Sequence, residues 1–266
     1  MSLIDTHCHL DFNAYDDIRA AVIQEAADAG VTRIINPGVD LPRTQAALAI
    51  ADAYPGVYAA VGIHPNSTVG FSDDGLDQVR ALADHPKVVA IGEIGIDYYW
   101  DDAPKEVQWA AFEAQLALAA ERALPVIVHN RDASDDVLAI LTTWTATLPS
   151  ALKDRPGVLH SFSAPQAVAD RGIELGFYLG FTGPVTFKNA DDLRRIAARV
   201  PVDRILVETD GPFLTPHPYR GKRPNKPAYV RLVAQRIAAL HNLPDEEFFA
   251  QSTANAERLF ALPPAE

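Results

Sequence analysis

The stretch Leu3-Ile4-Asp5-Thr6-His7-Cys8-His9 is a short apolar run that leads into two histidines separated by one residue. Side chains of an extended chain alternate between two faces, so Asp5, His7 and His9 are expected on one face and Cys8 on the other. Two neutral imidazoles on one face at a strand end can bind a divalent cation from one side. On its own, this pair is equally typical of ordinary surface or core histidines.

Composition limits the class of protein. The chain has 266 residues, of which 48% are apolar and 22% charged, which suits one large α/β domain or two small ones. No apolar run is long enough for a membrane span, and the N-terminus has no signal-peptide pattern, so we expect a cytoplasmic protein. The single cysteine, Cys8, excludes a disulfide framework and a thiolate-rich metal site; we expect it to be a small buried side chain.

The formal net charge is −12. An acidic balance of this size argues against a broad, nonspecific nucleic-acid-binding surface. It leaves room for a polyanionic substrate that is held locally by metal ions and a few arginines.

Short apolar runs alternate with longer, alanine-rich stretches of helical spacing along the whole chain. We expect strands at 3–7, 32–36, 57–62, 88–93, 125–129, 158–160, 177–181 and 204–210. We expect helices at 16–29, 41–54, 72–83, 104–123, 134–144, 165–175, 189–200, 227–240 and 245–260. Strands that alternate with helices are parallel and joined by crossovers, and near-continuous apolar strands are covered on both faces.

Both an open, doubly wound sheet and a closed (β/α)8 TIM barrel fit this alternation. The polar residues favour the barrel, because they gather at the C-terminal ends of the strands, where the active site of such a barrel lies. Five histidines and two carboxylates occupy these ends: His7, His9, His64, His129, His160, Glu93 and Asp210. A carboxylate at the end of a buried strand is costly without a partner, so this convergence indicates a metal site. No internal repeat or linker divides the chain, so we predict one α/β domain over residues 1–266.

The number of candidate ligands suggests two divalent ions. His7, His9 and Asp210 would bind one ion, because the first and last strands of a closed barrel are neighbours. His129 and His160 would bind the other, and Glu93 could bridge the two with its two oxygens. His64 is followed by Pro65 and a loop, which favours a group that faces the substrate over a further ligand. Two such ions can activate water and stabilise both sides of a displacement at phosphorus.

Further residues near the strand ends are candidates for substrate binding. Arg131 follows His129 by two residues and could bind a phosphate, although a salt bridge to Asp132 or Asp135 is an alternative. The loop at 219–226 concentrates basic residues in an acidic chain, among them Arg220, Lys222 and Arg223. The stretch Asp97-Tyr98-Tyr99-Trp100 could stack bases or sugars, or could simply pack.

In these motifs the chain resembles the TatD deoxyribonuclease family. The matching stretches, in order, are Asp5-Thr6-His7-Cys8-His9-Leu10-Asp11, Gly62-Ile63-His64-Pro65, Ile91-Gly92-Glu93-Ile94-Gly95-Ile96-Asp97-Tyr98, Pro125-Val126-Ile127-Val128-His129-Asn130-Arg131, His160-Ser161-Phe162-Ser163, Glu208-Thr209-Asp210-Gly211-Pro212-Phe213-Leu214 and Arg220-Gly221-Lys222-Arg223. Two departures are visible. The family often has Cys at the position of Ser161, and its basic loop often ends in Arg-Asn-Glu-Pro where this chain has Arg223-Pro224-Asn225-Lys226-Pro227.

The resemblance implies a (β/α)8 metal-dependent hydrolase with the ligands named above, acting on DNA, commonly as a 3′–5′ exonuclease, with two Mg, Mn or Zn ions. Single-stranded DNA or 3′ ends would be the substrate, with no membrane partner and a monomer as a plausible state. Glu93 and Asp210 would be the catalytic carboxylates, with Asp210 as acceptor of a proton from water. Two alternatives stay open. One is an amidohydrolase-like ester or amide hydrolase, such as a D-aminoacyl-tRNA deacylase; the other is a non-enzymatic metal-binding protein.

Overall fold

The computed structural model describes residues 2–100 and 102–263 of the chain. Residue 101 and the two ends of the predicted domain, residue 1 and residues 264–266, lie outside the described residues. Within the described part, eight parallel strands form one sheet in the order β1 to β8. The strands are β1 (Leu3–Asp5), β2 (Val31–Pro37), β3 (Val57–Val61), β4 (Val88–Asp97), β5 (Val126–Arg131), β6 (Gly157–Leu159), β7 (Tyr178–Phe181) and β8 (Ile205–Val207).

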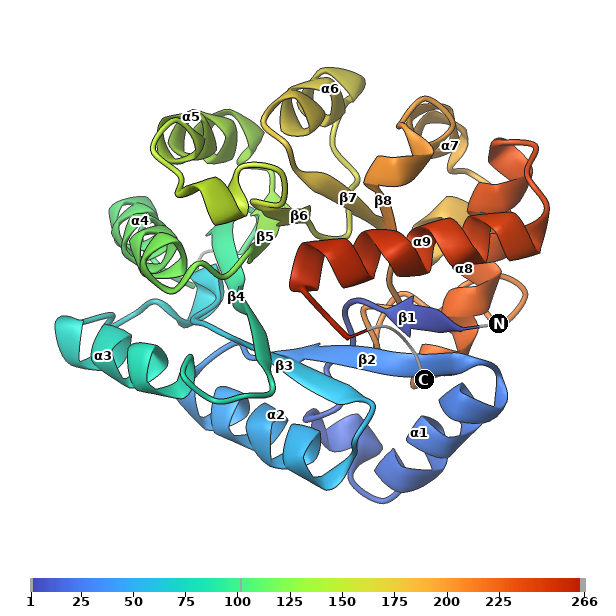
Figure 1. The fold of residues 1–266 in the computed structure, drawn as a ribbon, viewed down its shortest axis with the longest axis horizontal. Coiled ribbons are helices and arrows are strands. Elements are labelled where there is room, and N and C mark those ends of the chain that lie inside the picture. Colours follow the sequence, from blue (N-terminus) through green and yellow to red (C-terminus); the bar gives the residue numbers. More distant parts are fainter. Residues whose placement is uncertain (1, 101, 264–266) are drawn as a thin grey trace.

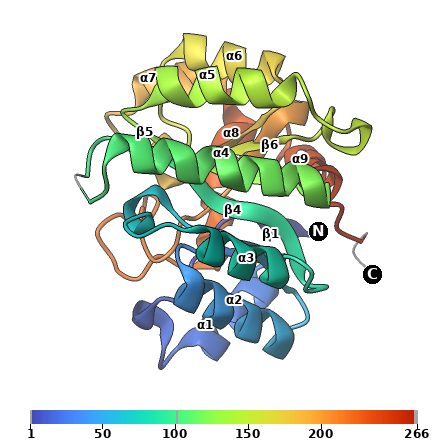
Figure 2. The same cartoon turned by 90° about the vertical axis from the view of Figure 1, so that its left-hand side faces the viewer.

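The helices lie outside the sheet, as Figure 1 shows. They are α1 (Arg19–Asp28), α2 (Leu41–Ala53), α3 (Asp73–Leu82), α4 (Lys105–Arg122), α5 (Ser134–Thr145), α6 (Gln166–Glu174), α7 (Asp191–Ala197), α8 (Val230–Leu240) and α9 (Asp245–Phe260). Viewed from the side, α3, α4 and α5 lie next to one another on one flank (Figure 2). The predicted TIM barrel is confirmed. None of the helices in the described part is long and apolar enough to span a membrane.

Backbone hydrogen bonds close the barrel beyond the ends of its first and last strands. Thr6 donates to the carbonyl of Val207 at 3.3 Å, and the amide of Asp210 donates to the carbonyl of His7 at 2.8 Å. His9 in turn donates to the carbonyl of Gly211 at 2.8 Å. The expected adjacency of the first and last strands is therefore present in the fold.

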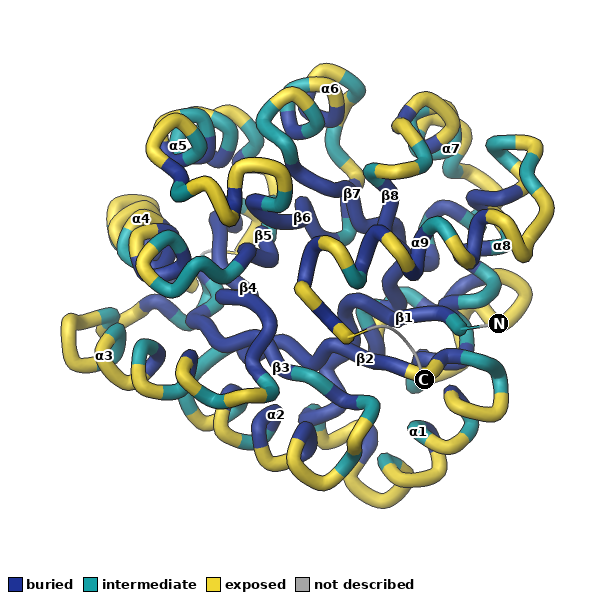
Figure 3. The backbone as a smooth tube through the Cα atoms, in the orientation of Figure 1, coloured by how far each residue is buried: buried dark blue, intermediate teal, exposed yellow. Residues whose placement is uncertain are grey.

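Burial follows the barrel architecture. The strands are buried along most of their length, and the outer faces of the helices are exposed (Figure 3). The barrel interior is filled by side chains such as Ile4, Ile35 and Tyr178, which form one cluster with Leu259 and Phe260 of α9. Helix α9 thus closes the N-terminal end of the barrel, and the C-terminal end is left for the polar residues.

Several predicted strand ends were wrong. β1 stops at Asp5 rather than residue 7, and β8 stops at Val207 rather than residue 210, because the chain turns to bring its polar residues together. Asp210 itself has a φ of 53°, which an extended strand does not allow. β4 instead continues four residues past Glu93 to Asp97, because residues 94–97 still pair with residues 128–131 of β5.

Candidate metal centre

A cavity of about 1030 Å³ opens at the C-terminal end of the barrel. Six of the seven histidines and carboxylates predicted at the strand ends line it: His9, His64, Glu93, His129, His160 and Asp210. His7 lies beneath them and is fully buried. The sequence motifs therefore converge on one place, at the end of the barrel opposite α9.

The first two histidines are positioned by closure of the barrel rather than by a regular strand. The Asp5 carboxylate accepts hydrogen bonds from the amide of Thr209 at 2.9 Å and from its hydroxyl at 2.5 Å. These two hydrogen bonds connect the C-terminal end of β1 to the residues that follow β8. The Nε2 atoms of His7 and His9 then lie 3.2 Å apart, while Cys8 is buried away from the site, as expected.

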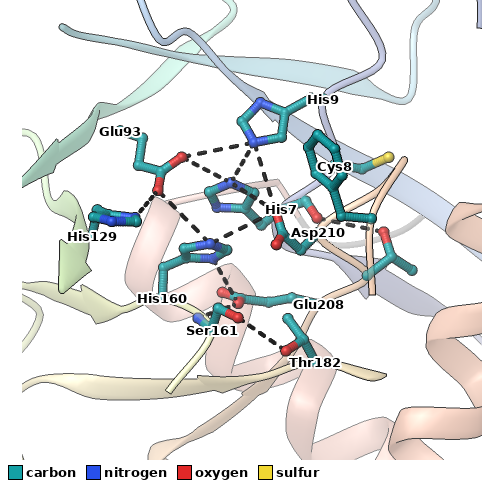
Figure 4. Close-up of polar contacts among 12 residues, drawn as sticks. His7, Cys8, His9, Glu93, His129, His160, Ser161, Thr182, Glu208 and Asp210 are labelled. Carbon is teal, nitrogen blue, oxygen red and sulfur yellow. Dashed lines mark hydrogen bonds and ion pairs between the residues drawn. The ribbon is translucent and has the colours of Figure 1, made fainter. Parts of the chain in front are cut away.

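Glu93 contacts four of the histidines, His7, His9, His129 and His160 (Figure 4). The pairing of β4 with β5 shifts register between Ile91 and Ile94, and Glu93 lies within this irregularity. Its Oε2 is 3.3 Å from His7 Nε2 and 3.7 Å from His9 Nε2. Register shifts of this kind re-aim a side chain, and here the shift aims a carboxylate at the two histidines that follow β1.

The other oxygen of Glu93 faces a second set of histidines. Oε1 is 2.9 Å from His129 Nδ1, 3.6 Å from His64 Nε2 and 3.8 Å from His160 Nε2. His160 Nε2 is also 3.8 Å from Asp210 Oδ1, so His160 lies between the two groups instead of belonging only with His129. Each carboxylate oxygen of Glu93 thus faces a different set of histidine nitrogens.

The spacing of His7, His9, Glu93 and Asp210 fits one metal ion. Ligands bound at about 2.1 Å in a tetrahedral arrangement lie about 3.4 Å from one another. The Nε2 atoms of His7 and His9 lie 3.2 Å apart, and each lies 3.3 to 3.9 Å from an oxygen of Glu93 and of Asp210. Imidazole nitrogens and carboxylate oxygens also form the donor set that zinc, manganese and related ions accept.

A second group with metal-binding spacing consists of His64, Glu93 and His129, and a third combines His7 with His160 and Asp210. For His64, however, the Nδ1 atom accepts a hydrogen bond from the amide of Asn66 at 3.2 Å. A neutral His64 therefore carries its proton on Nε2, which makes this atom a donor. This favours the expected substrate-facing role over that of a ligand.

Two carboxylates orient two of the histidines through hydrogen bonds. Glu208 Oε2 is 2.9 Å from Nδ1 of His160, which leaves Nε2 of His160 facing the cavity. Asp97 Oδ2 is 2.9 Å from Nε2 of His129, which leaves Nδ1 of His129 facing Glu93. Carboxylates of this kind fix the tautomer of a metal-binding histidine and strengthen it as a ligand. Glu208 was not among the predicted site residues. A second carboxylate near Asp210, directly after an apolar run, could have pointed to it.

Burial and mutual attraction shift the ionisation of the group. Burial alone would raise the pKa of Glu93, but the surrounding histidines outweigh it and hold the pKa well below its usual range. Burial would lower the pKa of His160, yet the neighbouring carboxylates of Glu208 and Glu93 raise it to about 10. For His64, burial dominates and lowers the pKa to about 3, so its imidazole is neutral. The metal-free site thus stores positive charge on His160 next to ionised Glu93.

Helix α4 positions two of the strand ends with buried glutamines that sequence reasoning missed. Gln115 accepts a hydrogen bond from the amide of Ile63 at 2.7 Å and donates to its carbonyl at 3.0 Å. Gln108 pairs in the same way with the amide and carbonyl of Asp97, at 2.9 and 3.0 Å. The two glutamines are seven residues apart, so they share one face of the helix, and each fixes the backbone next to a site residue.

The structure separates the predicted substrate-binding residues. Asp97, Arg131 and Arg223 line the cavity with His64. Tyr98 does not: its hydroxyl donates to Asp136 at 2.6 Å and accepts from the indole of Trp109, so it packs between α4 and α5.

Arg220 and Lys222 also lie off the cavity lining. Arg220 sits 4.1 Å from the centre of the Phe187 ring, and Lys222 lies 5.1 Å from the ring of Tyr219. Of the three predicted basic residues of this loop, only Arg223 lines the cavity.

The family model described as TatD related DNase matches residues 4–261 of this chain. The chain belongs to this family. It is 44% identical over 260 residues to the uncharacterised metal-dependent hydrolase YabD of Bacillus subtilis, with 98% of this chain and 99% of the relative covered. It is 35% identical over 266 residues to the 3′-5′ ssDNA/RNA exonuclease TatD of Erwinia billingiae, with 98% and 100% covered.

Among solved structures, the crystal structure of YjjV, a TatD homologue of Escherichia coli K12, matches with a TM-score of 0.90 and 35% identity over 98% of each chain. Membership of the TatD family confirms the resemblance seen in the motifs and confirms the enzyme class, a metal-dependent hydrolase. It also removes the non-enzymatic alternative.

Proposed function

We propose that this TatD-family protein is a 3′–5′ exodeoxyribonuclease that hydrolyses phosphodiester bonds of single-stranded DNA at a two-metal centre. The observation that carries the proposal is Glu93, whose two oxygens face two separate sets of histidine nitrogens at 2.9 to 3.8 Å. Divalent ions held by these residues would activate water and offset charge at phosphorus. The substrate and polarity are supported by relatives from Erwinia and Klebsiella that are named 3′-5′ ssDNA/RNA exonucleases.

The residues divide into three roles. His7, His9, Glu93, His129, His160 and Asp210 would hold two divalent ions, such as Mg, Mn or Zn. Ions in this position would lower the pKa of a water molecule and offset the negative charge of the phosphate. Asp210, at the wall of the same cavity, would accept the proton that the attacking water loses.

The remaining groups bind the phosphate. His64 is neutral and presents an N–H from Nε2, while Arg131 and Arg223 add two cationic groups at the wall of the cavity. Donors already in place next to developing negative charge stabilise a transition state without further rearrangement. The net charge of −12 disfavours nonspecific binding of polyanions to the rest of the surface.

Digestion of end-labelled DNA tests the proposal. A single strand labelled at the 5′ end should give a ladder of shortening products, and the same strand labelled at the 3′ end should release labelled mononucleotide at once. Mg, Mn and Zn are compared, with a chelator as control. Glu93→Gln should abolish turnover, whereas Glu113→Gln on the exposed face of α4 should retain it. Absence of metal-dependent cleavage, or early release of a 5′ label, would contradict the proposal, and hydrolysis of a chromogenic ester panel instead would favour the ester-hydrolase alternative.

A further inference from the structure

Three exposed aromatic side chains surround the cavity. Tyr99, Trp100 and Phe213 are 55%, 52% and 41% exposed, and all three line the cavity wall. Within the described residues, only two other aromatic side chains of this size reach similar exposure, Trp109 and Tyr219. Exposed apolar surface that gathers at one place marks a binding site more often than chance.

The first two aromatics are held in place by the site itself. The amides of Tyr99 and Trp100 both donate to Asp97 Oδ1, at 2.9 and 3.0 Å. The other oxygen of this carboxylate is the one that contacts His129. The rings meet edge to face with centroids 4.9 Å apart, and the guanidinium of Arg131 lies 4.1 Å from the centre of the Tyr99 ring. The hydrogen bonds to Asp97 and the contact with the Arg131 cation thus join this aromatic pair to the candidate metal centre.

The third aromatic lies across the barrel. Phe213 follows Asp210 by three residues, beyond β8, whereas Tyr99 and Trp100 follow β4. In a closed sheet of eight strands in sequence order, the fourth and eighth strands are on opposite sides. The Phe213 ring packs edge to face against Phe12 at 5.8 Å, and Phe12 in turn stacks on His9 at 4.7 Å. The metal centre therefore lies between two aromatic walls.

We propose that Tyr99 and Trp100 on one wall and Phe213 on the other stack unpaired nucleobases that flank the bond to be cleaved. The proposal rests on the proposed function and adds the part of the substrate that the metal centre does not contact. Every base has a π face, so such a site accepts any sequence. Bases of a duplex already stack on one another, so the site selects single strands. Arg131 and Arg223 in the same cavity can bind the phosphates of such a strand, whereas an apolar protein partner would leave both cations without a partner.

Binding of two synthetic strands separates base stacking from attraction to phosphate. One is an oligothymidylate, and the other has the same length and charge but lacks its bases; both carry phosphorothioate linkages that resist hydrolysis. Affinities are measured by fluorescence anisotropy with metal-free and with Mn²⁺-loaded protein. The base-bearing strand should bind at least about fivefold more tightly than the abasic strand. A Tyr99→Ala, Trp100→Ala double variant should reduce this preference, with little change in affinity for the abasic strand.

Matched variants control for loss of an aromatic surface as such. Trp109→Ala removes an exposed aromatic side chain outside the cavity and should keep the preference, as should Tyr99→Phe and Trp100→Phe, which keep a ring. Equal affinity for both strands, no binding of either strand, or a full preference in the double variant would overturn the inference. Cleavage of DNA without a preference for bases would defeat this inference alone. A clear preference in a protein that cleaves no DNA would defeat the proposed function alone.

Discussion

Glu208 shows how one buried residue outside the cavity determines the chemistry of another. It is fully buried and accepts hydrogen bonds from His160 Nδ1 at 2.9 Å and from the amide of Ser161 at 3.0 Å. Without these bonds the imidazole of His160 could rotate, and its Nε2 would no longer face Glu93 and Asp210. The contact is therefore a requirement for the shape of the site, although Glu208 does not line the cavity.

Replacing Glu208 should weaken metal binding. We expect Glu208→Ala to lower the affinity for Mn²⁺ or Zn²⁺ by about 10- to 100-fold, the usual cost of removing a carboxylate behind a metal-binding histidine. Glu208→Gln should recover part of the loss, because the glutamine side-chain oxygen can still accept a hydrogen bond from Nδ1–H of His160. Calorimetric titration with metal measures both. Unchanged affinity in Glu208→Ala, beside an unchanged Glu113→Ala control, would argue against His160 as a ligand.

The protonation of His160 predicts how metal affinity depends on pH. Its pKa is raised to about 10, so the metal-free protein carries a proton there at neutral pH. A metal ion competes with that proton, and affinity should therefore rise with pH, by up to about tenfold per unit below pH 10 for one displaced proton. Dissociation constants for Mn²⁺ at pH 6, 7 and 8 measure this, and titrations in two buffers count the protons released. Constant affinity over this range, without proton release, would be the opposite result.

At the scale of single elements, the sequence pattern located the strands well because buried parallel strands are continuous apolar runs. It misplaced their ends at β1, β4 and β8, since local composition does not report where a barrel closes. Convergence of the polar residues was predictable from parallel topology alone. The orientation of Tyr98 away from the cavity was not, because it depends on contacts with α4 and α5 that come from distant sequence.

Helix α4 illustrates what periodicity alone hides. Its buried face contains two glutamines, which pattern rules read as polar interruptions. Gln115 is fully buried. The oxygen and the nitrogen of its side-chain amide both form hydrogen bonds with the backbone of Ile63, directly before His64. The helix therefore acts as a rigid support for the end of β3 as well as a cover for the sheet.

Gln115→Leu should destabilise the protein by about 2 kcal/mol or more, since it leaves the buried amide and carbonyl of Ile63 without their partner. Gln24→Leu on the exposed face of α1 is the control, and its effect should stay within about 0.5 kcal/mol. Urea denaturation measures the free energy of unfolding of each variant. Equal stability of Gln115→Leu and the wild type would show that the amide does not support the β3 end.

At the scale of the whole molecule, stability and chemistry are placed at opposite ends of one barrel. Helix α9 seals the N-terminal end with Leu259 and Phe260, and the ionisable groups occupy the C-terminal end. Arg33 of β2 adds a polar tie to this seal through Glu257 of α9 at 2.5 Å. The general division was predictable from the barrel fold; the identity of the sealing helix was not, because several helices have similar apolar faces.

This separation predicts a variant that changes stability alone. Leu259→Ala removes a fully buried side chain and should cost about 2–5 kcal/mol of unfolding free energy, while the metal affinity of the folded protein stays unchanged. Val69→Ala, at an exposed position, is the control for both measurements. A large loss of metal affinity in folded Leu259→Ala would mean that the two ends of the barrel are coupled.

Anomalous diffraction from crystals grown with Mn²⁺ locates the ions themselves. We expect two peaks about 3.5–4 Å apart, one on each side of the Glu93 carboxylate, with His7, His9 and Asp210 around one and His129 and His160 around the other. Full occupancy of a single peak, or ions that do not contact Glu93, would contradict a bridged two-metal centre.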